Sequence, residues 1–273
     1  MQLSIIVTSY KNPALLKLCL EALRENIKGI SYEVVVSDGE TGEDTSFMMK
    51  ENFPQMKFLP HKENVGFGGL VNEGLKEAKG NFCFIINGDI IVKEEKAVAK
   101  LIDYYKKNEN IGLVGPKLIN FDNTVQDSCF RFYKISTVIY RRTFLKKFSF
   151  AKKELDRFLM KDTNKENSPV EADWIMGSAM LVSRENIEKI GVMDRSFFMY
   201  FEDVDWCWRF WEKGLKVVYN PWSEVYHYHG KQSANKSVLK AVFFNKYARV
   251  HLQSALKFFW KHKTLGWRKP YSY

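Results

Sequence analysis

Short apolar runs alternate with segments of helical periodicity along the first 90 residues. The runs at 3–8, 32–37, 56–59 and 81–86 are rich in apolar and β-branched residues, and three of them end at polar residues; this pattern predicts buried strands. Leucines recur at helical spacing after Pro13, and a second helix is predicted over 70–78. Strands that alternate with helices predict an α/β fold in which a mainly parallel sheet is flanked by helices.

The second half of the chain has a different character. Residues 122–168 are rich in Lys, Arg, Phe and Tyr and close in a polar stretch, and we expect an irregular, partly helical insertion there. After it, the apolar pattern predicts a regular segment at 173–182, helices near 184–190 and 204–214, and a strand over 215–219 that ends at Pro221.

Polar side chains lie where the predicted strands end. Because ligands of parallel α/β sheets bind beyond the carboxyl ends of the strands, these side chains should converge on one crevice. A glycine-rich turn before the fourth strand can bring backbone N–H groups near an anion, although it fits neither the dinucleotide fingerprint nor the P-loop. The residues are Thr8, Ser9, Tyr10, Asp38, Asn87 and Asp89 at the strand ends, and Asn64, Gly66, Phe67 and Gly68 in the turn.

Three acidic residues, Glu202, Asp203 and Asp205, stand close together in an aromatic frame. Two like charges about 4 Å apart repel by roughly 4 kcal/mol at an effective dielectric near 20. Burial of the cluster therefore requires a cation, a bound polyol or a raised carboxyl pKa. Asp205 precedes Arg209 by one helical turn and can form a structural ion pair. Glu202 and Asp203 can stabilise a helix dipole, and Asp203 is also a candidate general base.

Asn87 and Asp89 present an amide and a carboxylate at the end of one buried strand. Oxygen donors of this kind suit Mg²⁺ or Mn²⁺ that bridges to substrate phosphates, although Asn-Gly-Asp is also a common turn sequence. His227 follows Pro221 on a predicted loop or short strand. It is either a metal ligand or a hydrogen-bonded structural residue.

The net charge of +10 is concentrated near the end of the chain. Nine of the 42 Lys and Arg residues lie in 236–273, which holds no acidic residue, so 33 basic and 32 acidic residues remain in 1–235. A neutral body argues against nucleic-acid binding. A basic, aromatic tail with helical spacing favours either contact with an anionic membrane or packing on the core.

Other bulk features narrow the class of protein further. The four cysteines form no CxxC pair, which argues against a zinc site or a disulfide framework. The first residues lack a basic segment and a cleavage signal, and no apolar run approaches the roughly 18 residues of a membrane span. We therefore expect a globular protein of the cytoplasm.

Six ordered motifs resemble the inverting family 2 glycosyltransferases of GT-A fold, and among these the rhamnosyltransferase-like branch most. The resemblance covers roughly residues 3 to 233. The chain departs from the branch at Gly88, where proline is common, and at Gly39 and Glu40 after the second strand. The motifs are Val7–Tyr10 with Asp38, Asn64–Gly68, Asn87–Asp89, Trp174–Gly177, Phe198–Asp205 and Pro221–Gly230.

The resemblance implies a nucleotide-sugar site in the first half of the chain. Residues Thr8 to Tyr10 would lie near the base and ribose, Asp38 would hydrogen-bond one of them, and the turn around Gly66 would also belong to the donor site. Asp89 would carry the metal that bridges the diphosphate, with His227 as the second metal ligand.

The resemblance also implies an acceptor site in the second half. Asp203 would be the base that deprotonates the acceptor hydroxyl, and Glu202 would orient the acceptor or the base. Trp174 and Gly177 would shape the acceptor side.

The implied reaction is a metal-dependent transfer of a hexose, with Mg²⁺ or Mn²⁺ as cofactor and inversion at the anomeric carbon. Rhamnose from dTDP-rhamnose is the leading donor, ahead of another hexose from a UDP, dTDP or GDP donor. The acceptor would be a hydroxyl of a surface polysaccharide or a lipid-linked glycan.

We expect a GT-A domain over 1–235, in which 1–120 binds the nucleotide sugar, 121–170 is a basic insertion and 171–235 is the catalytic half. Residues 236–273 would form a basic helical tail that either contacts the inner face of the cell membrane or packs on the core.

Two other functions fit parts of the sequence. A nucleotidyltransferase shares the sheet architecture and the use of metal, but it normally needs a basic glycine-rich loop near the first strand, where this chain offers only Lys11. A basic nucleic-acid-binding protein would fit the net charge, but no binding motif is recognisable.

Overall fold

A computed structural model of the chain describes residues 1–228 and 246–263. The first half confirms the predicted alternation of strands and helices, because each apolar run forms a strand within about two residues of its expected bounds. Its elements are β1 (Leu3–Tyr10), α1 (Pro13–Asn26), β2 (Tyr32–Gly39), α2 (Glu43–Asn52), β3 (Lys57–Pro60), α3 (Phe67–Glu77), β4 (Phe82–Asn87), β5 (Ile90–Ile91), α4 (Ala97–Lys107) and β6 (Ile111–Ile119).

The second half is less regular, and its basic insertion is partly helical as expected. The elements are β7 (Val125–Gln126), β8 (Cys129–Phe130), α5 (Ile135–Arg142), the 3₁₀ helix η1 (Phe144–Lys147), α6 (Ser149–Phe158), β9 (Val170–Glu171), β10 (Trp174–Ile175), β11 (Ala179–Ser183), α7 (Arg184–Ile190), α8 (Glu202–Glu212), β12 (Lys216–His227) and α10 (Lys246–Lys261). In the part of the chain that the structure describes, no helix combines the length and hydropathy needed to cross a bilayer.

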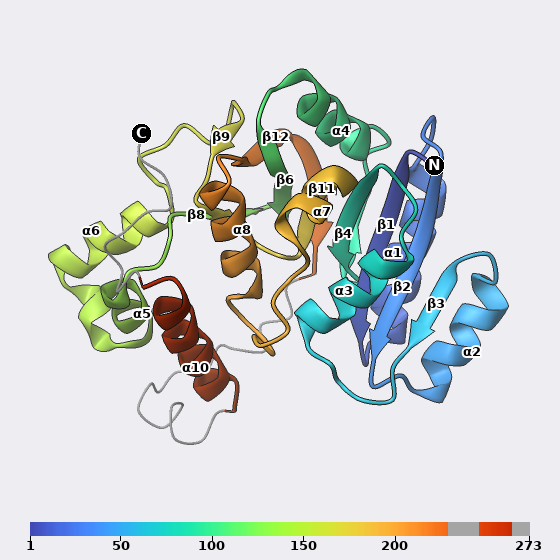
Figure 1. The fold of residues 1–273 in the computed structure, drawn as a ribbon, viewed down its shortest axis with the longest axis horizontal. Helices are drawn as coiled ribbons and strands as arrows, with labels where there is room; N and C mark the ends of the chain where they lie inside the picture. Colours follow the sequence, from blue (N-terminus) through green and yellow to red (C-terminus); the bar gives the residue numbers. More distant parts are fainter. Residues whose placement is uncertain (229–245, 264–273) are drawn as a thin grey trace.

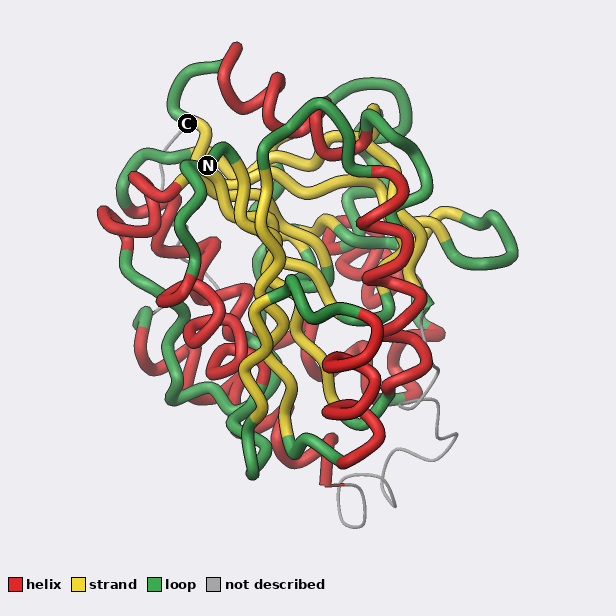
Figure 2. Tube along the Cα trace, turned by 90° about the vertical axis from the view of Figure 1, so that its right-hand side faces the viewer, coloured by secondary structure: helices red, strands yellow, loops and turns green. Residues whose placement is uncertain are grey.

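One twisted sheet runs through the molecule, with helices on both of its faces (Figures 1 and 2). Its strands follow the order β3-β2-β1-β4-β11-β6-β12-β5. Alternate residues of β1 point to opposite faces, so Ile5 and Val7 join one apolar cluster and Ile6 joins the other. Burial on both faces explains why the strands read as continuous apolar runs.

The sheet is mixed rather than parallel throughout. Strands β1 to β4 pair in parallel, but β11 lies antiparallel between β4 and β6. The chain reaches β11 at the carboxyl end of β4, where the Asn87 amide donates to the Ser178 carbonyl at 3.0 Å, so β11 must run back along its neighbour. This reversal places the loop around Gly177 at the edge where ligands of such sheets bind.

Strand β12 is longer than predicted. The expectation that it ends at Pro221 is wrong, because it continues to His227 after a register shift between Asn220 and Glu224. A bulge accommodates a proline, which has no N–H for the ladder. The continuation pairs His227 with Ile90 of β5 and so brings the histidine to the end of β4.

The described part of the tail forms α10, which packs on the body of the protein. Phe258 is fully buried against the rings of Phe201 and Trp208. Leu256 and Trp260 lie on the outer side, and Trp260 is 84% exposed. Core packing therefore accounts for one face of this helix, whereas residues 236–245 and 264–273 of the predicted tail lie outside the described residues.

Candidate functional site

The predicted donor residues meet at the carboxyl edge of the sheet. Thr8 stands opposite Asn87 and Ser9 stands opposite Asp38 in the registers of β1 with its two neighbours. The Thr8 hydroxyl donates to Asn87 Oδ1 at 3.2 Å, and the Gly88 amide donates to the Thr8 carbonyl at 2.7 Å. The convergence expected from the strand ends is thus confirmed.

The side chain of Asp38 is fully buried at this edge. Neither carboxylate oxygen has a hydrogen-bond partner among the described residues. Burial raises the pKa of Asp38, and the nearby hydroxyls of Ser9 and Thr41 and the imidazole of His61 oppose that shift. An unpaired buried carboxylate costs free energy, so this group is prepared for a ligand that donates hydrogen bonds.

Tyr10 lies farther out. It is exposed, and its hydroxyl donates to Glu40 Oε2 at 2.8 Å while Lys11 pairs with Glu40 Oε1 at 2.6 Å. These three residues form the polar rim of the edge.

The glycine-rich turn requires its glycines. Gly66 has a φ of +77°, and a Cβ there would stand 2.2 Å from the Phe198 carbonyl oxygen. The Asn64 side chain accepts a hydrogen bond from the Gly66 amide at 2.9 Å, which fixes the turn that starts α3. A Cβ on Gly68 would stand 3.7 Å from Glu202 Cβ. The turn therefore joins the donor residues to the acidic cluster.

Asp89 and His227, the two residues predicted to bind one ion, lie side by side. His227 Nε2 is 3.5 Å from Asp89 Oδ1, and this oxygen is buried without a hydrogen-bond partner in the described residues. The other imidazole nitrogen, Nδ1, lies 2.6 Å from Oε1 of Gln126. If Nδ1 donates that bond, the Nε2 lone pair faces the carboxylate, which is how a supporting residue orients a histidine toward a metal.

The donor set fits a divalent cation that takes its remaining ligands from a substrate. One carboxylate and one imidazole would leave several coordination positions of the ion open, and Mg²⁺ or Mn²⁺ fills such positions with water and phosphate oxygens. The described residues hold no group of three or more His, Cys, Asp or Glu side chains placed to bind a metal. Gln126 was not foreseen, because only the pairing of β7 with β6 brings it to this edge.

Asp203 is held in place by two backbone amides. The Gly177 amide donates to Oδ2 at 3.0 Å and the Val204 amide donates to Oδ1 at 2.9 Å. A Cβ on Gly177 would come within 2.8 Å of the Phe67 ring, so the close approach of the loop to the start of α3 depends on glycine. The structure thus joins Asp203 with Gly177, one of the three predicted acceptor residues.

Trp174, also a predicted acceptor residue, lies inside the protein. It is buried, its ring stacks on Phe130 at 4.4 Å between centroids, and its indole N–H donates to the Arg131 carbonyl at 3.1 Å. The structure places Trp174 in an aromatic cluster with Phe130, Tyr133 and Phe158.

Burial perturbs both carboxyls at the start of α8. It raises the pKa of Asp203 to about 6, against the two amide hydrogen bonds that lower it. Burial, and then the charge of Asp203, raises the pKa of Glu202 well above its ordinary value. The helix starts after Tyr200 and Phe201, which both have left-handed φ angles of 66° and 68°. Strained backbone beside perturbed carboxyls is typical of functional sites.

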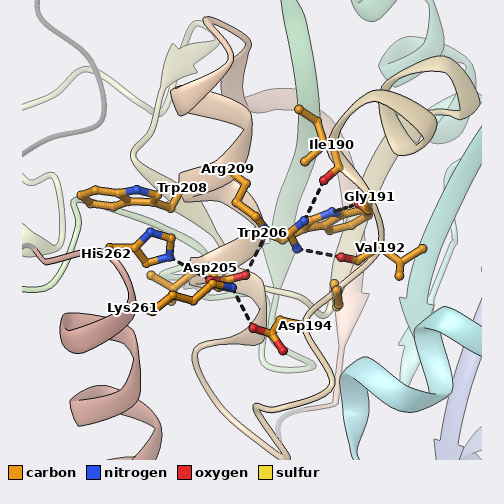
Figure 3. A network of polar contacts seen from close by, with 12 residues as sticks. Ile190, Gly191, Val192, Asp194, Asp205, Trp206, Trp208, Arg209, Lys261 and His262 are labelled. Carbon is orange, nitrogen blue, oxygen red and sulfur yellow. Dashed lines mark hydrogen bonds and ion pairs between the residues drawn. The ribbon is translucent and has the colours of Figure 1, made fainter.

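Asp205 has a structural role, as expected from its spacing to Arg209. It is fully buried and accepts from Arg209 Nε at 3.0 Å, and Lys261 and His262 at the end of α10 lie 2.7 and 2.8 Å from its other oxygen (Figure 3). Burial alone would raise the pKa of Asp205, but these partners hold it below its usual value. The contacts from Lys261 and His262 had no local signal in the sequence.

Comparisons with known proteins identify the family of the chain. The model of the family described as glycosyl transferase family 2 matches residues 4–209. The chain is 25% identical over 279 residues to "Rhamnosyltransferase WbbL" of Escherichia coli K12, covering 96% of this chain and 94% of that protein. It is 23% identical to the "N-acetylglucosaminyl-diphospho-decaprenol L-rhamnosyltransferase" of Mycobacterium tuberculosis H37Rv, covering 87% of this chain and 77% of that protein.

Solved structures show the same fold. A mannosyltransferase from Pyrobaculum calidifontis in complex with GDP-Man and Mn²⁺ has a TM-score of 0.61 at 16% identity, over 96% of this chain and 64% of that one. GalNAc-T7 with UDP, GalNAc and Mn²⁺ also has a TM-score of 0.61, at 17% identity, over 94% of this chain and 50% of that one. This chain spans about half to two thirds of those solved chains, and their fold is GT-A. With the family model matching well over half of its residues, the chain belongs to glycosyl transferase family 2.

Proposed function

We propose that this glycosyltransferase moves rhamnose from dTDP-rhamnose to a hydroxyl of a surface-polysaccharide or lipid-linked glycan acceptor, with inversion of the anomeric configuration. The observation that carries the proposal is the environment of the Asp203 carboxyl. This carboxyl has a pKa raised to about 6, is aimed by two backbone amides, and adjoins the donor turn through Glu202 and Gly68. The names of the relatives support rhamnose as the sugar.

A single displacement uses these residues as follows. The Asp203 carboxylate takes the proton of the acceptor hydroxyl as that oxygen forms a bond to the anomeric carbon. The bond between the anomeric carbon and the diphosphate oxygen breaks, and its electron pair leaves with the nucleoside diphosphate. Because attack and departure occur on opposite faces of the sugar, one base is sufficient and the configuration inverts.

The donor half holds the nucleotide. Asp38 would accept hydrogen bonds from the base or the ribose, since its buried oxygens lack partners among the described residues. Asp89 and His227 would hold Mg²⁺ or Mn²⁺, which supplies positive charge for the departing diphosphate. Gln126 would keep the imidazole of His227 oriented.

We also propose that the protein works at the inner face of the cell membrane, with the tail 236–273 as one contact. The outer row of α10 supports this, because Leu252, Leu256 and Trp260 stand exposed at helical spacing while the opposite side is buried.

A binding screen followed by a transfer assay tests the proposal. Nucleotide sugars are compared for thermal stabilisation with and without Mn²⁺; a ligand at about 100 times its Kd should add about 2.7 kcal/mol. dTDP-rhamnose should stabilise the protein only with Mn²⁺. Asp203→Asn should bind the donor but lose transfer, whereas Asp103→Asn on α4, an exposed control, should keep both. Unchanged turnover in Asp203→Asn, or a product that retains the donor's configuration, would refute the mechanism.

A further inference from the structure

The basic insertion exposes an unusual number of large apolar side chains. We define the insertion face as the outward side chains of α5, η1 and α6, which lie together at one end of the molecule, far from α2 (Figure 1). Phe144 is 70% exposed and Phe150 is 55% exposed. The apolar members are Ile135, Ile139, Phe144, Phe148 and Phe150, and the basic members are Lys146, Lys147, Lys152 and Lys153.

The aromatic members form one patch rather than isolated exposed residues. The rings of Phe148 and Phe150 stack with centroids 5.8 Å apart, Phe144 contacts Phe148 at 6.4 Å, and Tyr140 contacts Phe150 at 5.6 Å. Single exposed apolar residues need no explanation, but a contiguous apolar patch rimmed by polar groups marks an interaction site.

The charge of the face identifies the class of partner. Residues 134–158, which include all three helices, contain eight Lys or Arg and two acidic residues. Glu154 pairs with Lys134 and Arg157, and Asp156 pairs with Lys161. A second copy would set two positive faces against each other, which is unfavourable. An anionic bilayer instead offers acidic headgroups to the lysines and an acyl boundary to the rings, the combination that interfacial segments use.

We propose that the insertion face docks on the surface of an anionic lipid bilayer. The insertion contacts the candidate acceptor site, because Tyr133, two residues before α5, packs on Phe201 at 4.8 Å between ring centroids, and Phe201 precedes Glu202. The inference deepens the membrane placement proposed above, rests on it, and assigns it to a second surface besides the tail.

Co-sedimentation of the full chain with vesicles tests this without donor or acceptor. Vesicles of phosphatidylcholine alone are compared with vesicles in which about a third of the lipid is phosphatidylglycerol. Binding should require the anionic lipid. The variant Phe144→Ser/Phe148→Ser/Phe150→Ser should bind about 100-fold more weakly, at roughly fivefold for each partly inserted ring. Lys146→Gln/Lys147→Gln should lose about 25-fold at low salt.

The matched control is Phe47→Ser/Lys50→Gln on α2. Phe47 is 69% exposed and Lys50 is exposed, at the opposite end of the molecule, so this variant should bind like the wild type. All substituted side chains are exposed, and thermal melts should confirm that the variants fold.

Three outcomes would overturn the inference. Equal binding of the aromatic variant and the wild type would remove the insertion face from the contact. Loss of binding in Trp260→Ser alone would leave the tail as the contact and keep the membrane placement. A wild-type dimer in sedimentation velocity that the aromatic variant abolishes would make the face an interface between copies.

Discussion

Replacing Asp203 with asparagine should stabilise the protein above about pH 7 while abolishing transfer. The wild-type carboxyl has a pKa of about 6 in place of an ordinary 3.8. The native state therefore binds more protons than the unfolded state between about pH 4 and pH 6, and stability falls as the pH rises through that window. At 1.36 kcal/mol for each pKa unit, the ionised group costs about 3 kcal/mol of folding free energy above pH 7.

Asparagine is neutral like the protonated carboxyl, but its NH2 group cannot accept from the amide of Gly177 or Val204, so one of these two hydrogen bonds is lost. The unfolding free energy of Asp203→Asn should therefore lie about 1 kcal/mol below that of the wild type near pH 4. At pH 8 the variant should be more stable by about 2 kcal/mol or more. The coupled carboxyl of Glu202 adds to the difference, because the charge of Asp203 raises its pKa.

Urea denaturation at about pH 4 and about pH 8 measures both values. Asp103→Asn, on the exposed side of α4, should change stability by less than about 0.5 kcal/mol at either pH. The transfer rate should drop by about 10²-fold or more in Asp203→Asn, and in the wild type it should fall as the pH drops below about 6. A stability difference between Asp203→Asn and the wild type that is the same at both pH values would refute the raised pKa.

Three further substitutions test other parts of the site. Gly66→Ala should destabilise the protein by at least about 2 kcal/mol, because φ is +77° and the new Cβ would meet the Phe198 carbonyl oxygen at 2.2 Å. The control in the same denaturation series is Gly42→Ala, whose Cβ meets nothing within 4 Å. Gln126→Leu removes the acceptor at the His227 imidazole and should weaken Mn²⁺-dependent nucleotide binding by about 10- to 100-fold in calorimetry. An unchanged nucleotide Kd in the presence of Mn²⁺ would exclude a role of Gln126 in orienting His227. Asp205→Asn should cost about 2 kcal/mol, because it removes the charge of a fully buried carboxylate that pairs with Arg209 and Lys261. A melting temperature equal to that of the wild type would contradict the ion network.

The local sequence was sufficient to place the donor edge. Apolar runs of strand length end at Thr8, Asp38 and Asn87, and parallel strands must bring such ends to one edge. The pair of Asp205 with Arg209 also follows from spacing alone, because residues four apart on a helix are neighbours. These features depend on contacts within one element or between consecutive elements.

Contacts between distant segments were decided by the tertiary structure. No local pattern shows that β11 reverses direction and brings Gly177 onto Asp203, or that β7 carries Gln126 to His227. The burial that raises the pKa of Asp203 likewise arises only when the loop and α8 pack together. The sequence by itself determined which chemical groups are present and at which position of its own strand or helix each group lies. Their pairing, burial and proton affinity depend on registers between segments up to about a hundred residues apart, which periodicity along the chain does not encode.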